Sequence, residues 1–384
     1  MIPFNKPHIT GKEVHYIHDA VATGKISGNG KYTQLCQRYF EERWGFKKTL
    51  LTTSCTDALE MSALLLDIQP GDEVIVPSYT FVSTALAFVR QGAKIVFADS
   101  RKDHPGIDED QIEALITPKT KAIVPVHYAG VSCDMDKIMD IAKRYNLFVV
   151  EDAAQAIDSY YTHQNPNAEH KKQNAKHPLG TIGHLSVFSF HETKNIQCGE
   201  GGLLGINDER FAKRAEIIWE KGTNRAEFFR GEVNKYGWLD TGSSFLPSDI
   251  TAAFLWAQLE EIDKIQTRRK EIWDSYYAGL KDWAEQNGVQ LPSIPPYATN
   301  NGHMFYLVCP TPEFRTDLIH KLKDSGTHAV FHYLSLHKSD FYLSKHDGRE
   351  LSEADRYSEC LVRLPMYFDL INQIQLVKKS LTIV

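Results

Sequence analysis

Residues 186–205 read SVFSFHETKNIQCGEGGLLG, and a single lysine, Lys194, stands between two patterns that predict buried structure. The residues before it alternate in an apolar run typical of a buried strand, and the glycines of Gly199–Gly202 predict a tight turn after it. Ammonium groups are rarely buried without a partner, so an exposed lysine is the ordinary interpretation. In a loop between buried elements, however, desolvation lowers the pKa of an amine. That suits Lys194 to Schiff-base chemistry with an aldehyde cofactor such as pyridoxal 5′-phosphate (PLP).

A PLP site also needs an acid for the pyridine nitrogen of the cofactor, and the sequence offers one upstream. Residues 147–150, LFVV, form a short apolar run typical of a strand in a parallel sheet, and Glu151 and Asp152 follow at its carboxyl end. We predict that Asp152 pairs with the pyridine nitrogen and keeps it protonated, so that the ring acts as an electron sink. The alternative is that Asp152 caps a helix, which is common after a strand.

Small polar residues stand where a phosphate could bind. Ser54, Cys55 and Thr56 precede an apolar-periodic helix that we predict over residues 58–66. The free N–H groups and the dipole at a helix N-terminus attract a phosphate. Serine and threonine are also ordinary helix caps, and this segment alone favours the cap.

Strands and helices alternate through the first half of the chain, which predicts a parallel sheet. Strands are expected at residues 73–77, 94–98 and 121–126, and polar or aromatic residues follow each of them. Ligands of such sheets bind at the carboxyl ends of the strands. Phe81 is therefore a candidate to stack on a cofactor ring, although an aromatic residue there is more often part of the core. His127 is equally well explained as a structural histidine.

Length and composition restrict the class of protein. At 384 residues the chain is expected to form two domains, a large one over residues 1–248 and a smaller one over residues 249–384. Its net charge of −6 and the lack of a basic cluster argue against nucleic-acid binding. No apolar run approaches membrane-spanning length and the start at Met1 lacks signal-peptide character, so we expect a cytoplasmic protein that binds no membrane. The six cysteines are scattered without CxxC spacing, which indicates neither a disulfide framework nor a zinc site.

The remaining segments are expected to be mostly helical. Helices are predicted over residues 13–23, 32–44, 209–221, 249–269, 271–286, 315–325 and 371–381, and strands over residues 303–308 and 329–332. Residues 163–177, HQNPNAEHKKQNAKH, lack apolar periodicity and predict an exposed loop. Metal binding by the three histidines of this segment is the alternative, but no regular ligand spacing supports it, so no metal is expected.

Several stretches together resemble the sugar-nucleotide aminotransferases of the DegT/DnrJ/EryC1/StrS family. They are GKISGNG (24–30), PGDEV (70–74), PSYTF (77–81), VHYAG (126–130), EDAAQ (151–155), FSFHETK (188–194) and GEGG (199–202). The resemblance covers nearly the whole chain and is greatest to members that make dTDP-4-amino-4,6-dideoxygalactose, in stretches such as LLTTSCTDALEM and AVFHY. It implies an α/β protein of PLP fold type I, like aspartate aminotransferase. Such a protein has a large domain with a mostly parallel seven-stranded sheet between helices, and a smaller C-terminal α/β domain.

The resemblance also implies a role for individual residues. Lys194 would carry the cofactor and later move the proton, while Asp152 would pair with the pyridine nitrogen. Gln155 would lie near the 3-hydroxyl of the cofactor and Phe81 would stack on its ring. The residues implied to hold the phosphate are Cys55, Thr56 and Ser189, and the loop residues implied to contact the sugar are Ser27, His332 and Tyr333.

Members of this family are homodimers with shared active sites, so the resemblance implies a second subunit near the cofactor. The family pattern there is Gly-x-Asn-x-Arg, whereas this chain reads Gly242-Ser-Ser-Phe-Leu246. The polar contact from the partner would then come from Ser243 or Ser244, or would be missing.

The implied reaction has two halves. L-glutamate gives its amino group to PLP, and the aminated cofactor passes it to C4 of dTDP-4-keto-6-deoxy-D-glucose, giving a dTDP-4-amino sugar for surface polysaccharide synthesis. One alternative is amination at C3 of a dTDP-3-keto-6-deoxyhexose. The other is a non-catalytic regulatory or binding protein of the same fold, which the presence of both Lys194 and Asp152 disfavours.

Overall fold

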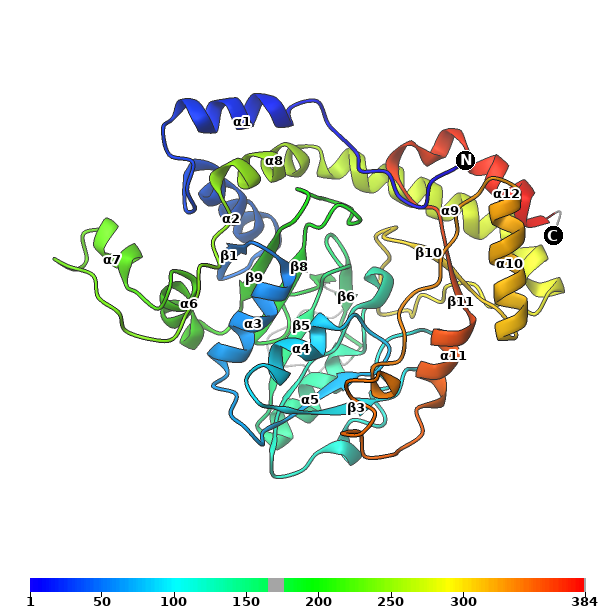
Figure 1. Ribbon diagram of the computed structural model, residues 1–384, viewed down its shortest axis with the longest axis horizontal. Helices are drawn as coiled ribbons and strands as arrows, with labels where there is room; N and C mark the ends of the chain where they lie inside the picture. Colours follow the sequence, from blue (N-terminus) through cyan, green and yellow to red (C-terminus); the bar gives the residue numbers. More distant parts are fainter. Residues whose placement is uncertain (165–175, 383–384) are drawn as a thin grey trace.

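The computed structural model describes residues 1–164 and 176–382 of the chain. Its centre is a seven-stranded sheet with helices on both faces (Figure 1). In spatial order the strands are β1 (Lys48–Thr52), β9 (Gly202–Ile206), β8 (Leu185–Ser189), β5 (Phe148–Asp152), β4 (Thr120–Ile123), β2 (Glu73–Pro77) and β3 (Lys94–Ala98). Strand β9 runs antiparallel to both of its neighbours, and the other pairs are parallel. The expected mostly parallel seven-stranded sheet of PLP fold type I is therefore confirmed.

The strands bury both faces because neighbouring residues point to opposite sides of the sheet. Val76, Val124 and Val150 pack into one apolar cluster with helices α3 (Cys55–Leu65) and α4 (Ser83–Val89). Their chain neighbours, such as Ile75 and Val149, pack into a second cluster, with helices α2 (Lys31–Trp44), α5 (Met135–Tyr145) and α8 (Asp249–Glu260). The result is three layers, helix, sheet and helix, which leave the carboxyl ends of the parallel strands free to build a site.

The other elements complete the chain in order. The longer ones are α1 (Glu13–Ala22), β6 (Tyr160–Thr162), β7 (Lys176–Pro178), α6 (Ala212–Trp219), α7 (Arg225–Phe229), α9 (Ile262–Gln286), β10 (Phe305–Val308), α10 (Pro312–Asp324), α11 (Ser352–Cys360), β11 (Leu361–Leu364) and α12 (Ile374–Thr382). Short 3-10 helices are η1 (Glu113–Leu115), η2 (Tyr128–Gly130), η3 (Glu209–Phe211), η4 (Leu336–Lys338) and η5 (Phe368–Asn372).

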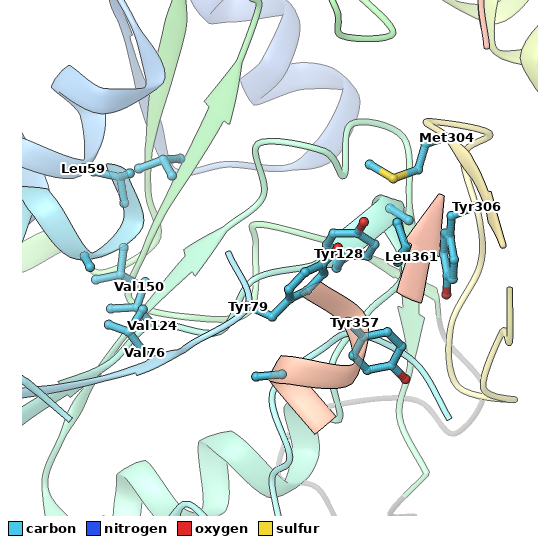
Figure 2. Packing of buried hydrophobic residues seen from close by; sticks show 14 of the residues in the cluster. Leu59, Val76, Tyr79, Val124, Tyr128, Val150, Met304, Tyr306, Tyr357 and Leu361 are labelled. Carbon is cyan, nitrogen blue, oxygen red and sulfur yellow. The ribbon is translucent and has the colours of Figure 1, made fainter. Parts of the chain in front are cut away.

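The C-terminal part packs on the first core rather than standing apart from it. Strands β10 and β11 form an antiparallel pair beside α9. Figure 2 shows Tyr79 and Tyr128 lying between the sheet residues, such as Val76, and the side chains of Met304 and Tyr306. One continuous apolar cluster thus joins the two parts of the chain. The division at residues 248 and 249 stays a prediction, and α8 packs against α1 and α2.

Two expected elements differ in the structure. The long helical region breaks at Glu261, between α8 and α9, and not near residue 270, and no proline or glycine marks that point. Residues 329–332 form no strand, because only Val330 pairs with β11, through two backbone hydrogen bonds to Arg363 of 3.1 and 2.7 Å. The chain then turns away at Tyr333, whose φ is +52°.

The described ends of the segment 163–177 agree with the predicted exposed loop only in part, because Gln164 and Lys176 are exposed whereas His163 is buried and residues 176–177 belong to β7. Strands β6 and β7 pair antiparallel, and His163 is buried with its ring 4.6 Å from that of His177. Residues 165–175, including His170, lie outside the described residues. Among the residues that are described, no group of three or more His, Cys, Asp or Glu side chains could hold a metal ion.

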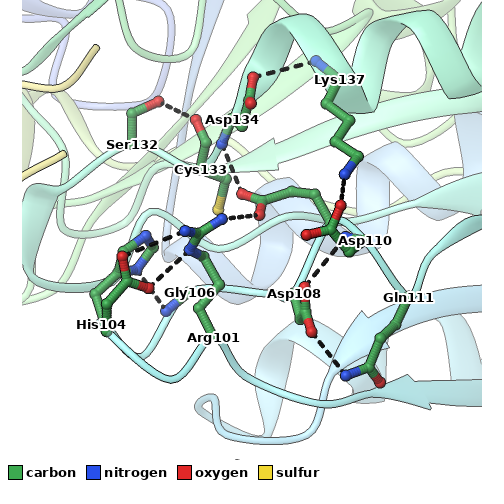
Figure 3. A network of polar contacts seen from close by, with 12 residues as sticks. Arg101, His104, Gly106, Asp108, Asp110, Gln111, Ser132, Cys133, Asp134 and Lys137 are labelled. Atoms are coloured by element: carbon green, nitrogen blue, oxygen red, sulfur yellow. Dashed lines mark hydrogen bonds and ion pairs between the residues drawn. The ribbon is translucent and has the colours of Figure 1, made fainter. Parts of the chain in front are cut away.

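A polar network joins the segment after the carboxyl end of β3 to the start of α5 (Figure 3). Arg101 donates to Asp103 at 2.9 Å and to the buried carboxylate of Glu109 at 3.0 Å. Glu109 also accepts the backbone N–H of Asp134, the N-cap of α5, at 2.6 Å. The network fixes the start of α5 and therefore supports β5, which follows it. Within the described part of the chain, no helix is long and apolar enough to cross a membrane.

Candidate active site

A cavity of about 700 Å³ opens at the carboxyl ends of β2, β5 and β8. Residues from these three strand ends, the N-terminus of α3 and the C-terminal part of the chain line it. Nine of the twelve candidate site residues lie in its lining: Cys55, Thr56, Phe81, Asp152, Gln155, Ser189, Lys194, His332 and Tyr333. The cavity therefore brings together side chains up to about 300 positions apart in the sequence.

Asp152 is the last residue of β5 and points into the cavity. Its Oδ2 accepts a hydrogen bond of 2.7 Å from Thr84 Oγ1, and its Oδ1 accepts one of 3.1 Å from the N–H of Ala154. Burial raises the pKa of the Asp152 carboxyl, and these two hydrogen bonds act in the opposite direction. No helix begins after Asp152, since the next element in the described chain is β6, so the helix-cap alternative was wrong.

Glu151, the neighbour of Asp152, points to the opposite face of the sheet and has a structural role. Its carboxylate accepts the N–H groups of Gly180 and Ile182 at 2.8 and 2.7 Å and pairs with His127 Nε2 at 2.9 Å. The Nδ1 of His127 accepts the N–H of Cys133. Both side chains are fully buried and their polar atoms are hydrogen-bonded. His127 therefore has the structural role that the sequence analysis gave as one of two alternatives.

Lys194 lies on the loop that joins β8 to β9, with its amine in the cavity. Burial lowers the pKa of the amine to about 8, and the nearby Cys55 and Asp152 act against this shift while Arg363 adds to it. The next residue, Asn195, anchors the loop, because its amide donates to Gln266 Oε1 at 2.8 Å and to the carbonyl of Asn301 at 2.9 Å. The loop thus holds an amine that is largely desolvated and readily deprotonated.

Helix α3 begins at the cavity, where Ser54 is the N-cap and accepts the N–H of Asp57 at 3.1 Å. Thr56 Oγ1 lies 2.8 Å from Ser83 Oγ. Gly202 of β9 allows this approach, since a Cβ there would lie 2.4 Å from the carbonyl of Ser54. The N-terminus of α3 can therefore lie directly against the sheet, with free N–H groups facing the cavity.

Aromatic and amide side chains form the opposite wall. Gln155 accepts the N–H of Ala129 at 2.6 Å and donates to the hydroxyl of Tyr333 at 3.0 Å. His332 is buried and its Nδ1 lies 2.6 Å from the hydroxyl of Tyr128. Tyr333 has a left-handed backbone that costs a non-glycine residue on the order of 1 kcal/mol or more. Phe81 lies at the mouth and is 55% exposed.

Three candidate residues do not line this cavity. Ser27 is exposed on the loop before α2, and Ser243 and Ser244 are exposed after α7. Ser243 uses its carbonyl to accept the N–H of Lys221 at 2.9 Å. A role of Ser243 or Ser244 in the site of a second subunit stays a prediction.

The sequence analysis missed several polar lining residues, among them Thr84, His303 and Arg363. Thr84 holds Asp152, and His303 bonds Asn195 Oδ1 through Nδ1 at 2.8 Å, next to Lys194. Arg363 lies on β11 in the run Leu361–Leu364, LVRL. An arginine inside an apolar strand is unusual, and this pattern could have marked Arg363 as a candidate site residue. Thr84 and His303 carried no local signal, because their neighbours are typical of ordinary core segments.

These residues fit PLP by their chemistry. An amine with a lowered pKa, a buried carboxylate and a helix N-terminus are the three groups that an aldehyde, a pyridine nitrogen and a phosphate require. All three lie in one cavity of about 700 Å³. The close approach of Gly202 to Ser54, which any side chain at residue 202 would block, lets the N-terminus of α3 reach the cavity, where a phosphate could bind.

Known proteins resemble the chain along nearly its full length. The model of the DegT/DnrJ/EryC1/StrS aminotransferase family matches residues 7–381. The spore coat polysaccharide biosynthesis protein SpsC of Bacillus subtilis is 32% identical over 382 residues, which cover 95% of this chain and 92% of SpsC. The aminotransferase TlmJ of Streptoalloteichus hindustanus superposes with a TM-score of 0.87 at 26% identity, covering 99% of this chain and 97% of TlmJ. The putative sugar aminotransferase Spr1654 of Streptococcus pneumoniae, in its PLP form, superposes with a TM-score of 0.84 at 26% identity and covers 99% of each chain.

Proposed function

The chain belongs to the DegT/DnrJ/EryC1/StrS aminotransferase family, and we propose that it is a dTDP-4-amino-4,6-dideoxygalactose transaminase. In this proposal it moves an amino group from L-glutamate to C4 of dTDP-4-keto-6-deoxy-D-glucose. The product, dTDP-4-amino-4,6-dideoxy-D-galactose, serves surface polysaccharide synthesis. The observation that carries the proposal is the meeting of Lys194 and Asp152 in one cavity with the N-terminus of α3.

The cofactor is PLP, which supplies an electron sink for the electrons of the C–H bond that is broken next to the transferred nitrogen. Asp152 holds the pyridine nitrogen by a charged hydrogen bond, and Thr84 orients the carboxylate of Asp152. The N–H groups at the start of α3 bind the phosphate together with Thr56 and Ser189. Gln155 orients the 3-hydroxyl side of the ring, and its own orientation is set by Tyr333.

Lys194 serves both halves of the reaction as base and acid. Its Nζ takes the proton from the α-carbon of the amino donor, and in the second half it delivers a proton to C4 of the sugar. A pKa of about 8 suits this work, because near neutral pH the amine can both accept and donate a proton at low cost.

The identity of the sugar rests on the sequence stretches, whereas the relatives support only the broader class of sugar aminotransferase. LLTTSCTDALEM forms β1 and the start of α3, and AVFHY ends in the wall residues His332 and Tyr333. Both stretches therefore border the cavity. SpsC is named for polysaccharide biosynthesis, which agrees with a nucleotide-sugar substrate.

We include a homodimer in the proposal, because apolar residues are exposed where a partner would cover the site. Phe81 and Val82 at the cavity mouth are 55% and 48% exposed. Trp238 and Phe229 are 83% and 69% exposed on the arm that carries α7 and extends away from the rest of the chain (Figure 1). Exposed apolar groups of this size mark interfaces. Light scattering of the purified protein tests the dimer, and a monomer of 43.7 kDa would contradict it.

The test of the reaction is product analysis. The protein with PLP and L-glutamate is incubated with dTDP-4-keto-6-deoxy-D-glucose, and NMR should identify the axial 4-amino product of galacto configuration. An equatorial 4-amino product would contradict the proposed galacto configuration but would still support amination at C4. Product formed only after a ketoisomerase has moved the carbonyl to C3 would replace the proposal by a 3-aminotransferase. The Lys194→Ala protein in parallel controls for non-enzymatic amination.

A further inference from the structure

Residues 331–335, which we call the bridge, run along the cavity, and backbone hydrogen bonds hold the chain on both sides of them. Before the bridge, Val330 exchanges two backbone hydrogen bonds with Arg363 of β11, of 3.1 and 2.7 Å. After it, the N–H of Leu336 donates to the carbonyl of Ser78, the residue that follows β2, at 3.0 Å. The bridge therefore connects the small C-terminal sheet to the edge of the central sheet.

The bridge carries two residues of the cavity wall and one strained backbone position. His332 and Tyr333 both line the cavity. The φ of Tyr333 is +52°, which is unfavourable for a bulky residue and persists only where the surrounding structure fixes it. The neighbours Phe331 and Leu334 are 54% and 67% exposed, so their packing contributes little to that fixation. The strained turn is therefore held mainly by the hydrogen bonds of the bridge and of its two ends.

A buried pair of side chains, Ser78 and His337, fastens the end of the bridge, and we call this pair the clasp. Ser78 Oγ lies 2.7 Å from His337 Nδ1 and also accepts the backbone N–H of His337 at 3.3 Å. The two residues are 0% and 3% exposed. With the bond to Leu336, three hydrogen bonds thus join Ser78 to the two residues that follow the bridge.

The hydrogen-bond partners of Ser78 fix the direction of the clasp. Its Oγ accepts the N–H of His337, so if Nδ1 also donated to it, the hydroxyl hydrogen would have no acceptor in the described part of the chain. Ser78 therefore donates to Nδ1, and the ring of His337 is neutral with its own hydrogen on Nε2. That hydrogen faces Asp355 of α11, whose Oδ1 lies 3.7 Å from Nε2.

The charges around His337 agree with a neutral ring. Burial lowers the pKa of His337, Asp355 acts against this shift, and His346 and Lys338 add to it. Asp99, which follows β3, opposes the shift with the smallest effect of these groups. The carboxylate of Asp355 is already paired with Lys338 Nζ at 2.7 Å. A neutral His337 can therefore accept the hydrogen bond from Ser78.

We propose that Ser78 and His337 are positioning residues that hold the cavity wall in the shape that the sugar requires; this deepens the proposed function and rests on it. Neither side chain is among the residues that line the cavity in the described chain, so the clasp acts through the bridge. In the proposed reaction His332 and Tyr333 of the bridge face the sugar. Without the clasp, the left-handed turn at Tyr333 can relax and the wall loses its orientation.

The two halves of the reaction should therefore respond differently to loss of the clasp. Asp152 is held by Thr84 of α4, and the loop of Lys194 is anchored through Asn195. Neither of these contacts involves the bridge, so the amino-acid half should depend little on the clasp. The sugar half needs the wall and should depend on it.

The test compares Ser78→Ala and His337→Leu, each of which removes one partner of the clasp. On protein loaded with pyridoxamine phosphate, the concentration of dTDP-4-keto-6-deoxy-D-glucose for half-maximal rate should rise about tenfold in each variant. The glutamate half, followed by the loss of visible absorbance of PLP-loaded protein, should stay within about threefold of wild type. The double variant should be about as impaired as either single one, because both changes remove the same hydrogen bond.

His337→Asn is the conservative variant, because its amide oxygen can replace Nδ1 as the acceptor, and it should recover most of the sugar half. Ser62→Ala is the matched control. Ser62 is also fully buried and its hydroxyl donates to the carbonyl of Ala58 at 2.9 Å, within α3, so this change should affect neither half. An unchanged sugar half, an equal loss in both halves or a loss that His337→Asn does not rescue would overturn the proposal.

A second measurement needs no sugar substrate. Amide hydrogen exchange of PLP-loaded protein, read by mass spectrometry, should be at least about tenfold faster over residues 331–338 in Ser78→Ala than in wild type, with β5 unchanged. Unchanged exchange over residues 331–338 would overturn the role of the clasp, whatever the substrate is. Faster exchange in the variant, together with a wild-type protein that aminates no dTDP-ketosugar, would contradict the proposed function and still confirm that the clasp holds the wall.

Discussion

Thr84 of α4 donates a hydrogen bond of 2.7 Å to Oδ2 of Asp152 at the end of β5, although 68 residues separate them. Thr84 also lies 3.0 Å, oxygen to oxygen, from Thr80. The hydrogen bond lowers the pKa of Asp152 against the effect of burial, and so favours the charged carboxylate that the pyridine nitrogen needs. The pair links the helix that follows β2 to the acid of the site.

Replacing Thr84 by valine keeps the shape and removes the donor. The carboxylate of Asp152 then loses one of its two hydrogen bonds, so we expect PLP affinity and kcat each to fall about tenfold. Absorbance titration with PLP and steady-state kinetics measure the two effects. Thr84→Ser retains the hydroxyl and should stay near wild type; a serine variant as weak as the valine variant would point to lost packing instead.

Asp152→Asn tests the charge itself. The amide has the same size but cannot hold a protonated pyridine nitrogen with an opposite charge, so turnover should fall at least about 100-fold while some PLP remains bound. The melting temperature should change little. A variant with normal turnover and only an altered melting temperature would assign Asp152 a purely structural role.

Lys194→Ala should fold normally and show no turnover. In the wild-type protein, borohydride reduction followed by peptide mapping should find the cofactor fixed on Lys194, since this amine has a lowered pKa and lies in the cavity. Circular dichroism of the variant checks the fold. Attachment of the reduced cofactor to a different lysine would contradict the assignment.

The lowered pKa of Lys194 makes a prediction about pH. Only the neutral amine attacks an aldehyde, and a pKa of about 8 means that deprotonation is complete at lower pH than for an ordinary lysine of pKa 10.5. The rate at which the apoprotein captures PLP should therefore rise with pH up to about 8 and level off above it. Stopped-flow absorbance measures this rate, with a simple alkylamine as control. A rate that still rises steeply between pH 9 and about 10 would show an unshifted amine.

Gly202→Ala should damage the phosphate end of the site. The added Cβ would lie 2.4 Å from the carbonyl of Ser54 and 2.5 Å from the N of Cys55, so the start of α3 must move. We expect PLP affinity to fall roughly tenfold or more and the melting temperature to drop by several degrees. Gly237→Ala is the matched control, because a Cβ there has no atom within 4 Å. Equal effects of the two substitutions would contradict this account of Gly202.

Much of the fold could be predicted from the sequence because it depends on local patterns. The strands at residues 73–77 and 94–98 have the predicted bounds in the structure, since each is a short apolar run between turn residues. Lys194 and Asp152 were found in the same way, one on a loop between buried elements and the other at a strand end. Their meeting also followed, because the carboxyl ends of parallel strands share one edge of the sheet.

What the sequence alone determined is therefore the order of the elements, the faces they bury and the two residues with a local chemical context. Only the tertiary structure placed Arg363 in the cavity and Thr84 against Asp152. It also showed that Ser27, Ser243 and Ser244 lie outside the cavity lining and that residues 329–332 form no strand. The physical reason is that apolar periodicity records whether a residue is buried but not what it is buried against. Arg363 and Lys194 are 169 positions apart, and only the packing of β11 beside the sheet brings them into one cavity.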